Sequence, residues 1–252
     1  MASPTPVMLS QRDHGSLGWV SSDPFTVLRN LVSVPVGGAE ALRAATSVPL
    51  VFRLTKNGTY DIQALLGGAG QFPFPYNPLP YVPFAIRFYP FTPVRVAAND
   101  HTKTWQLGVY NDPDVVVATG RAFFDAAGAI SATTRKVADQ FKQYCTDLDR
   151  AQAQAAQLFQ AGVLMHMQGQ PVHLKIINPQ ALDALDDQTL GALFRTGALQ
   201  MAQAVLMSGL HLIHMKKPIH SQTLQNQPPP TSGFMEAILT DLSHSEDMEG
   251  VE

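Results

Sequence analysis

The sequence predicts an α+β fold in a single globular body, with a mostly antiparallel β portion and short helices first and a helical portion after it. In the first half, runs of alternating apolar and polar residues are separated by turn residues, which is typical of short strands. From Thr133 onward, apolar residues recur at the spacing of a helix. Hydrophobic content of 45% and charged content of 15% are those of a folded protein and not of a disordered one.

The chain divides into a globular domain over residues 1–217 and a flexible tail over residues 218–252, which is rich in Pro and Gln and then acidic. All 17 Lys and Arg lie in the domain with 14 of the 20 Asp and Glu, so the domain carries +3 and the tail −6. Neither part has the clustered basic face of a nucleic-acid-binding protein. We therefore expect no nucleic-acid partner.

A short helix and a hairpin are expected between residues 40 and 66. The segment EALRAA (40–45) follows two glycines and has helix-forming residues. The Asn57-Gly58 pair supplies the positive φ of a tight turn between the runs VFRLT and TYDIQALL. These runs are predicted to pair as neighbouring strands.

The stretch Leu66–Phe91 (LGGAGQFPFPYNPLPYVPFAIRFYPF) holds six of the 19 prolines and eight of the 21 aromatic residues. A phosphate-binding loop is disfavoured because a proline takes the sixth position of the glycine pattern. A polyproline ligand is disfavoured because its large aromatic residues are costly to leave in water. A packed segment is favoured, with Pro83 opening a short helix and Pro90 ending it.

Strands are expected next at PVRVA and TWQLGVY, and one or two more in VVVATGRAFF. The long helix then runs from Thr133 to about Gly162, with Ser131 or Thr133 as its cap. Its apolar face falls at a spacing of four and three residues: Val137, Phe141, Tyr144, Leu148, Ala151, Ala155 and Leu158.

The sequence of the C-terminal part predicts a strand, VHLKIIN, followed by helices. Asn178-Pro179 starts a short helix, and Asp186 or Asp187 caps the next one. After Gly197 the segment ALQMAQAVLMSGLHLIHM is apolar nearly all round, so we expect it to be buried. In the tail, one helical face could bind a groove on a partner, although the sequence favours a solvated terminus. The residues of that face include Phe234, Met235, Ile238, Leu239 and Leu242.

The sequence lacks the common signatures of catalysis, so a non-catalytic protein is favoured and an enzyme remains the alternative. His211 and His214 lie near methionines, but histidine near a helix C-terminus and methionine in a core explain them without a metal. We expect no cofactor. The lone Cys145 is expected to be an inert apolar side chain. With neither a signal-peptide pattern nor an apolar run of about 18 to 20 residues, we expect a cytoplasmic protein without a membrane span.

Arg87 and Tyr89 are the most suggestive polar residues. A short helix that follows aromatic residues can present a cation and a hydroxyl at the mouth of an apolar pocket, as small-molecule and peptide sites do. The sequence favours the simpler interpretation, in which Arg87 lies along the aromatic surface in a cation–π contact.

Five blocks of the chain, in order, resemble the SapC-like family of bacterial proteins. They are LSQRDH with Trp19, VPVGGAEALRAATSVPLVF, YVPFAIRFYPF, the long Gln-rich helix, and NPQALDALDDQTLGALFRTGALQMAQAVLMSGL, together covering about residues 9–217. The match is weak over 97–130 and absent from the tail.

The resemblance implies an accessory or binding protein linked to peptide or amino-acid-derived compounds, or to an envelope (S-layer) system. It implies possible partners in envelope transport or in a flavin-dependent halogenase-like system, and the enzyme alternative is an oxidoreductase-like partner of such a protein. No catalytic residue follows from it. The candidate ligand-binding residues at the matching positions are His14, Trp19, Tyr81, Arg87 and Tyr89, and Phe234, Ile238 and Leu242 are the candidates in the tail.

Overall fold

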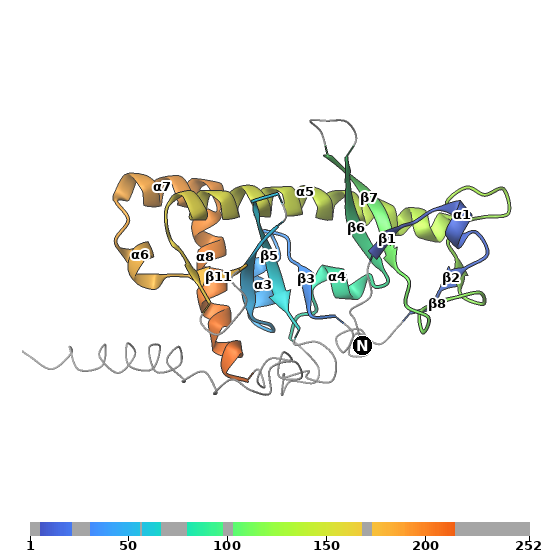
Figure 1. Cartoon of the computed structure of the whole chain (residues 1–252), viewed down its shortest axis with the longest axis horizontal. Coiled ribbons are helices and arrows are strands. Elements are labelled where there is room, and N and C mark those ends of the chain that lie inside the picture. The colour runs from blue at the N-terminus through green and yellow to red at the C-terminus, as the bar shows by residue number, and fades with distance from the viewer. Residues whose placement is uncertain are drawn as a thin grey trace, which may run out of the picture.

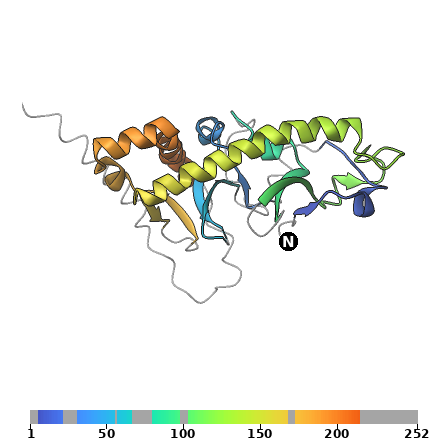
Figure 2. The same ribbon diagram turned by 90° about the horizontal axis from the view of Figure 1, so that it is seen from above.

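The computed structural model describes the chain in six segments: residues 6–21, 31–55, 57–66, 80–97, 103–167 and 173–214. They form an elongated body along which helix α5 (Ala132–Gln160) runs for most of the length (Figure 1). The two larger sheets lie on one side of this helix (Figure 2).

The largest sheet has five strands in the order β10-β11-β4-β5-β3, and every neighbouring pair is antiparallel. Its central hairpin is the predicted one, with Phe52 opposite Ile62 and a turn through Gly58 at φ 75°. Residues that carry a side chain rarely adopt a positive φ, so glycine suits this position of the turn. The hairpin prediction is confirmed. The strands are β3 (Ser33–Pro35), β4 (Leu50–Leu54), β5 (Tyr60–Leu65), β10 (Leu164–His166) and β11 (Leu174–Ile177).

A second sheet has the order β1-β7-β6, and a third, very short one has the order β8-β2-β9. The predicted strands at PVRVA and TWQLGVY are confirmed as β6 and β7, and VVVATGRAFF contributes two strands, β8 and β9. In the third sheet a Cβ on Gly18 would lie 2.6 Å from the main chain of Gly120, so the strands approach too closely for a side chain. The bounds are β1 (Pro6–Met8), β2 (Gly18–Trp19), β6 (Phe91–Ala97), β7 (Lys103–Tyr110), β8 (Val116–Val117) and β9 (Arg121–Ala122).

Helix α5 confirms the prediction made from its apolar period. The hydroxyl of Ser131 accepts a hydrogen bond from the Thr134 amide at 3.2 Å, so Ser131 is the cap. Gly162, at φ 74°, follows the helix. The predicted face is buried along the whole helix: Val137, Phe141, Tyr144, Leu148, Ala151, Ala155 and Leu158.

The C-terminal helices begin where the sequence predicts. Asn178 caps α6 (Pro179–Asp183) and Asp186 caps α7 (Asp187–Thr196), each through a side-chain oxygen that accepts an amide hydrogen bond. Gly197, with φ 79°, separates α7 from α8 (Ala198–Ser208), and a 3-10 helix, η1 (Gly209–His214), follows.

Helix α8 departs from the expectation of burial all round. Its inner side is buried, but Met207 is 56% exposed, and Leu210 at the start of η1 is 62% exposed. The apolar pattern correctly predicted a helix that packs in the core. It did not predict that one side of this helix faces solvent.

Three further short helices lie in the described residues: α1 (Gln11–His14), α3 (Ala41–Ala45) and α4 (Phe84–Arg87). Helix α4 starts directly after Pro83, as predicted, but it ends at Arg87, three residues before Pro90, and the chain enters β6 after that proline. Residues 67–79 of the aromatic stretch lie outside the described residues.

One main core joins these parts into a single body. It contains side chains from the five-stranded sheet, from β6, from α5 and from α8, which confirms the α+β prediction. Among its most deeply buried members are Phe52, Ile62, Phe91, Phe123, Leu158 and Met201.

Candidate functional site

A buried carboxylate joins the start of α3 to α4. Glu40 is only 5% exposed, and its Oε2 accepts hydrogen bonds from the Tyr81 hydroxyl at 2.7 Å and from the Phe84 amide at 3.0 Å. Its Oε1 accepts a hydrogen bond from the Gly37 amide at 3.2 Å. Both carboxylate oxygens are thus engaged, and the Tyr81 side chain is held in a fixed position.

Two arginines flank the Tyr81 ring. The Cζ atoms of Arg43 and Arg87 lie 5.2 Å and 5.7 Å from its centroid, within the range of cation–π attraction. Arg87 also lies over the Phe84 ring at 5.6 Å, and its Nη2 donates to the Tyr81 hydroxyl at 3.4 Å. Both arginines are exposed. No carboxylate of the described residues lies within ion-pair distance of either guanidinium.

The Tyr81 hydroxyl is a neutral donor at physiological pH. Burial, followed by the nearby charge of Glu40, raises its pKa to about 12, although Arg87 and Arg43 act in the opposite direction. Its proton therefore stays in the hydrogen bond to Glu40, and its oxygen can accept from Arg87. The result is a small cationic surface, which we call the Tyr81 surface: Arg43, Tyr81 and Arg87.

His14 and Tyr89 lie in the interior. His14 is 1% exposed, with Nε2 3.1 Å from the Asn111 side-chain oxygen and Nδ1 next to the main chain of Ser10. The Tyr89 hydroxyl donates to the buried Asp112 carboxylate at 2.6 Å. Burial and this hydrogen bond raise the pKa of Tyr89. Both side chains are therefore bound to protein groups.

Trp19 is also interior, and it lies among aromatic rings. Its ring meets Phe91 edge-on at 5.2 Å, and Arg121 lies over it at 5.1 Å. The indole Nε1 is buried without a hydrogen-bond partner among the described residues.

The structure thus separates the five candidate ligand-binding residues into an accessible pair, Tyr81 and Arg87, and an interior group of three. Sequence reasoning missed Glu40 and Arg43. A signal was available, because both belong to the EALRAA helix and a carboxylate at a helix start is common, but their contact with Tyr81 depends on the tertiary fold.

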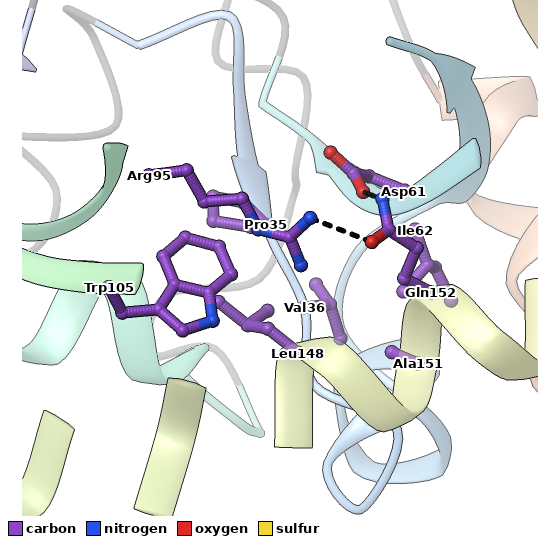
Figure 3. Close-up of a pocket in the computed structure, with 9 residues that line it drawn as sticks. All are labelled: Pro35, Val36, Asp61, Ile62, Arg95, Trp105, Leu148, Ala151 and Gln152. Carbon is purple, nitrogen blue, oxygen red and sulfur yellow. Dashed lines mark hydrogen bonds between the residues drawn. The ribbon is translucent and has the colours of Figure 1, made fainter. Parts of the chain in front are cut away.

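A cavity of about 30 Å³ lies where the sheets meet α5 (Figure 3). The side chain of Gln152 on α5 bridges two of the residues that line this cavity. It accepts a hydrogen bond from Arg95 Nη1 at 2.8 Å and donates one to Asp61 at 3.0 Å. Arg95 also pairs with Asp149 and stacks over Trp105 at 4.4 Å. These side chains join β5, β6, β7 and α5 by polar contacts.

The cavity is too small for a metabolite. Ligand pockets are typically about 300 to 1,000 Å³, whereas 30 Å³ can hold one or two water molecules. Burial raises the pKa of Asp61, while Arg53 and Arg95 partly oppose that shift. Arg95 and Trp105 lie directly opposite in the β6–β7 register, but the Asp61 and Gln152 contacts could not be read from a single strand or helix. We assign this cluster a structural role.

The remaining candidate residues from the sequence do not form a second site in the described segments. Burial raises the pKa of the Cys145 thiol to about 11. Across the described segments, no group of three or more His, Cys, Asp and Glu could hold a metal ion. His211 Nε2 lies 2.8 Å from the Ala45 carbonyl oxygen. The predicted tail residues Phe234, Ile238 and Leu242 lie outside the described residues.

None of the helices in the described segments is both long enough and apolar enough to cross a membrane. No curated protein and no solved structure matches the chain. The profile of the SapC family matches residues 9–215, which is most of the 252-residue chain. The protein therefore belongs to the SapC family.

Proposed function

We propose that this SapC-family protein is a non-catalytic binding protein whose ligand carries a carboxylate, and that the Tyr81 surface binds it. The observation that supports the proposal is the pair of exposed arginines beside one fixed aromatic ring, with no carboxylate of the described residues paired to either.

The charges of this surface favour an anion. Glu40 is the nearest acid, but both of its oxygens already accept hydrogen bonds from Tyr81 and from main-chain amides. Arg43 and Arg87 therefore keep donors for a ligand. Guanidinium groups bind carboxylates through paired hydrogen bonds, and their stacking on aromatic rings orients them.

The apolar surroundings favour a ligand with an aromatic or aliphatic side chain. Tyr81 is half-buried, and nearby Phe84 on α4 stacks at 4.4 Å on Phe88, which directly follows the helix. A free amino acid or a peptide C-terminus offers both a carboxylate and such a side chain. We therefore propose peptides or amino-acid-derived compounds as the ligand class.

His14, Trp19 and Tyr89 take a supporting role in this proposal. Tyr89 lies in the turn between α4 and β6, and its hydrogen bond to Asp112 holds this turn in place. We propose that the protein acts in the cytoplasm as an accessory to uptake of its ligand or to an envelope system.

Isothermal titration calorimetry tests the proposal. Phenylalanine and Gly-Phe are titrated into the full-length protein, and their C-terminal amides serve as matched ligands without the carboxylate. We expect the free acids to bind and the amides to bind much more weakly. Arg87→Ala or Arg43→Ala should weaken binding roughly 10- to 100-fold, because a hydrogen bond to a charged group contributes about 1.5 to 3 kcal/mol.

Arg135→Ala is the control, because Arg135 is an exposed arginine at the start of α5 and is not part of the Tyr81 surface. It should bind like wild type. Equal affinity for acid and amide, or undiminished affinity in both arginine variants, would refute the proposal.

A further inference from the structure

The side of α8 that faces solvent changes character along its length. It begins with the exposed residues Gln200 and Gln203, as expected for a helix surface. Toward the end it becomes apolar: Leu206 is 36% exposed, Met207 56% and Leu210 62%. We call these last three residues the apolar end of α8.

This arrangement is unusual because the three side chains are neighbours. Single exposed apolar residues are normal, whereas apolar residues gathered in one patch are frequent at surfaces that bind another segment or a partner. The spacing of 206, 207 and 210 places them on one helix face, over about one turn. The inner face of the same helix is already used by the core, through Met201, Ala204 and Val205.

The chain itself supplies a matching segment. After His214, where the described part ends, residues 215–252 follow, and they contain one run with apolar residues on a single helical face. Those residues are Phe234, Met235, Ile238, Leu239 and Leu242. Elsewhere in 218–252 the large apolar residues are isolated: Ile219, Leu224, Met248 and Val251. The run from Phe234 to Leu242 is therefore the part of the segment whose burial removes the most apolar surface from water.

The geometry of the connection favours docking within one molecule. Leu210 is four residues from His214, so the apolar end of α8 lies next to the point where the segment departs. The 19 residues between His214 and Phe234 can extend to roughly 60 Å at 3.3 Å each, which is ample to fold back. A tether of this length gives an effective concentration on the order of millimolar, far above that of a second copy or a separate partner.

The charges agree with this arrangement. Residues 1–217 carry 17 Lys and Arg against 14 Asp and Glu, a net +3, and residues 218–252 carry six acids and no Lys or Arg. The segment is therefore attracted to the body that it would cover.

We infer that residues Phe234–Leu242 dock as a helix on the apolar end of α8 of the same molecule. The inference is independent of the ligand proposed for the Tyr81 surface. It accounts for exposed apolar residues at the end of a helix whose inner face is already packed in the core.

Disulfide trapping in the full-length chain tests this arrangement. Cys145 is the only cysteine, so Cys145→Ala gives a background for Met207→Cys combined with Leu239→Cys. Mild oxidation should form the bond within one molecule, roughly tenfold or more faster than in the control, because docking exceeds random encounter at the tether's effective concentration. The control pairs Leu239→Cys with Gln143→Cys, an exposed position on α5.

Leu210→Gln, added to the trapping pair, should slow the reaction toward the control rate. Leu210 is exposed, so this change leaves the fold intact, and an unchanged circular dichroism spectrum verifies that. Equal rates in the test and control pairs would overturn the inference and point to a separate partner. Bonds formed mainly between two chains would also overturn it and assign the surface to a second copy.

Discussion

Removal of the Glu40 carboxylate should destabilise the fold more than any exposed charge does. In Glu40→Ala, three donors lose their acceptor: the Gly37 amide, the Phe84 amide and the Tyr81 hydroxyl. Each hydrogen bond to a charged group contributes about 1.5 to 3 kcal/mol. Three such bonds together would contribute about 4.5 to 9 kcal/mol. Tyr81 is half-buried and its hydroxyl can reach water in the variant, so we place the total loss below that range, at about 3 to 4 kcal/mol.

Urea denaturation measures this loss as a fall in the midpoint at constant slope. For a chain of this size, the same loss lowers Tm by roughly 10 °C. Glu40→Gln keeps one acceptor oxygen but turns an NH₂ group toward a donor, so it should fall between alanine and wild type. The control is Asp139→Ala, which removes an exposed pair with Lys142 at 2.7 Å and should cost less than about 0.5 kcal/mol.

A loss below about 1 kcal/mol in Glu40→Ala would refute the reasoning, because it would mean that the three donors find other partners. It would also remove the physical reason for a fixed Tyr81 ring.

Three further predictions concern the interior and the long helix. Burial raises the pKa of Asp61 above its ordinary value, so the stability that its protonated form contributes in acid is lost as the pH rises through that raised pKa. Asp61→Asn should therefore be as stable as wild type or more so at pH 7, with a flatter dependence of unfolding free energy on pH; a clear loss at pH 7 would contradict this. Cys145, with its pKa raised to about 11, should react with iodoacetamide at pH 7.5 only when the protein unfolds; fast labelling of native protein would disprove its inertness. Ser131→Ala should cost about 1 kcal/mol in urea, and Thr133→Ala much less; the reverse order would reassign the cap.

The regular elements could be predicted because their signals are local. Helix α5 follows from a repeat of apolar residues, and the β4–β5 hairpin follows from Asn57-Gly58 between two alternating runs. Caps such as Asn178 and Asp186 were identified for the same reason, since the side chain and the amide it accepts from are three residues apart.

Elements that depend on distant partners could not be predicted. Strand β10 (Leu164–His166) is three residues long and exists through its pairing with β11. The third sheet brings Trp19 beside Val116 and Arg121, which are about a hundred positions further along the chain. Such pairings leave no pattern within either strand alone.

The candidate site could be predicted only in part, because some of its residues come from distant parts of the sequence. Tyr81 and Arg87 are six residues apart around a short helix, so their proximity could be expected. Glu40 and Arg43 meet them across 41 and 38 positions of sequence, and only the fold shows this.

The central claim is that Arg43 and Arg87 together bind a carboxylate, and the arginine Nε–H resonances test it most directly. Nuclear magnetic resonance of ¹⁵N-labelled full-length protein would follow them during addition of Gly-Phe and then of Gly-Phe amide. We predict that the resonances of these two arginines shift with the free acid and stay in place with the amide, while Arg135 is unaffected by both. Equal shifts with acid and amide, or no shift of either arginine at saturating Gly-Phe, would contradict the claim.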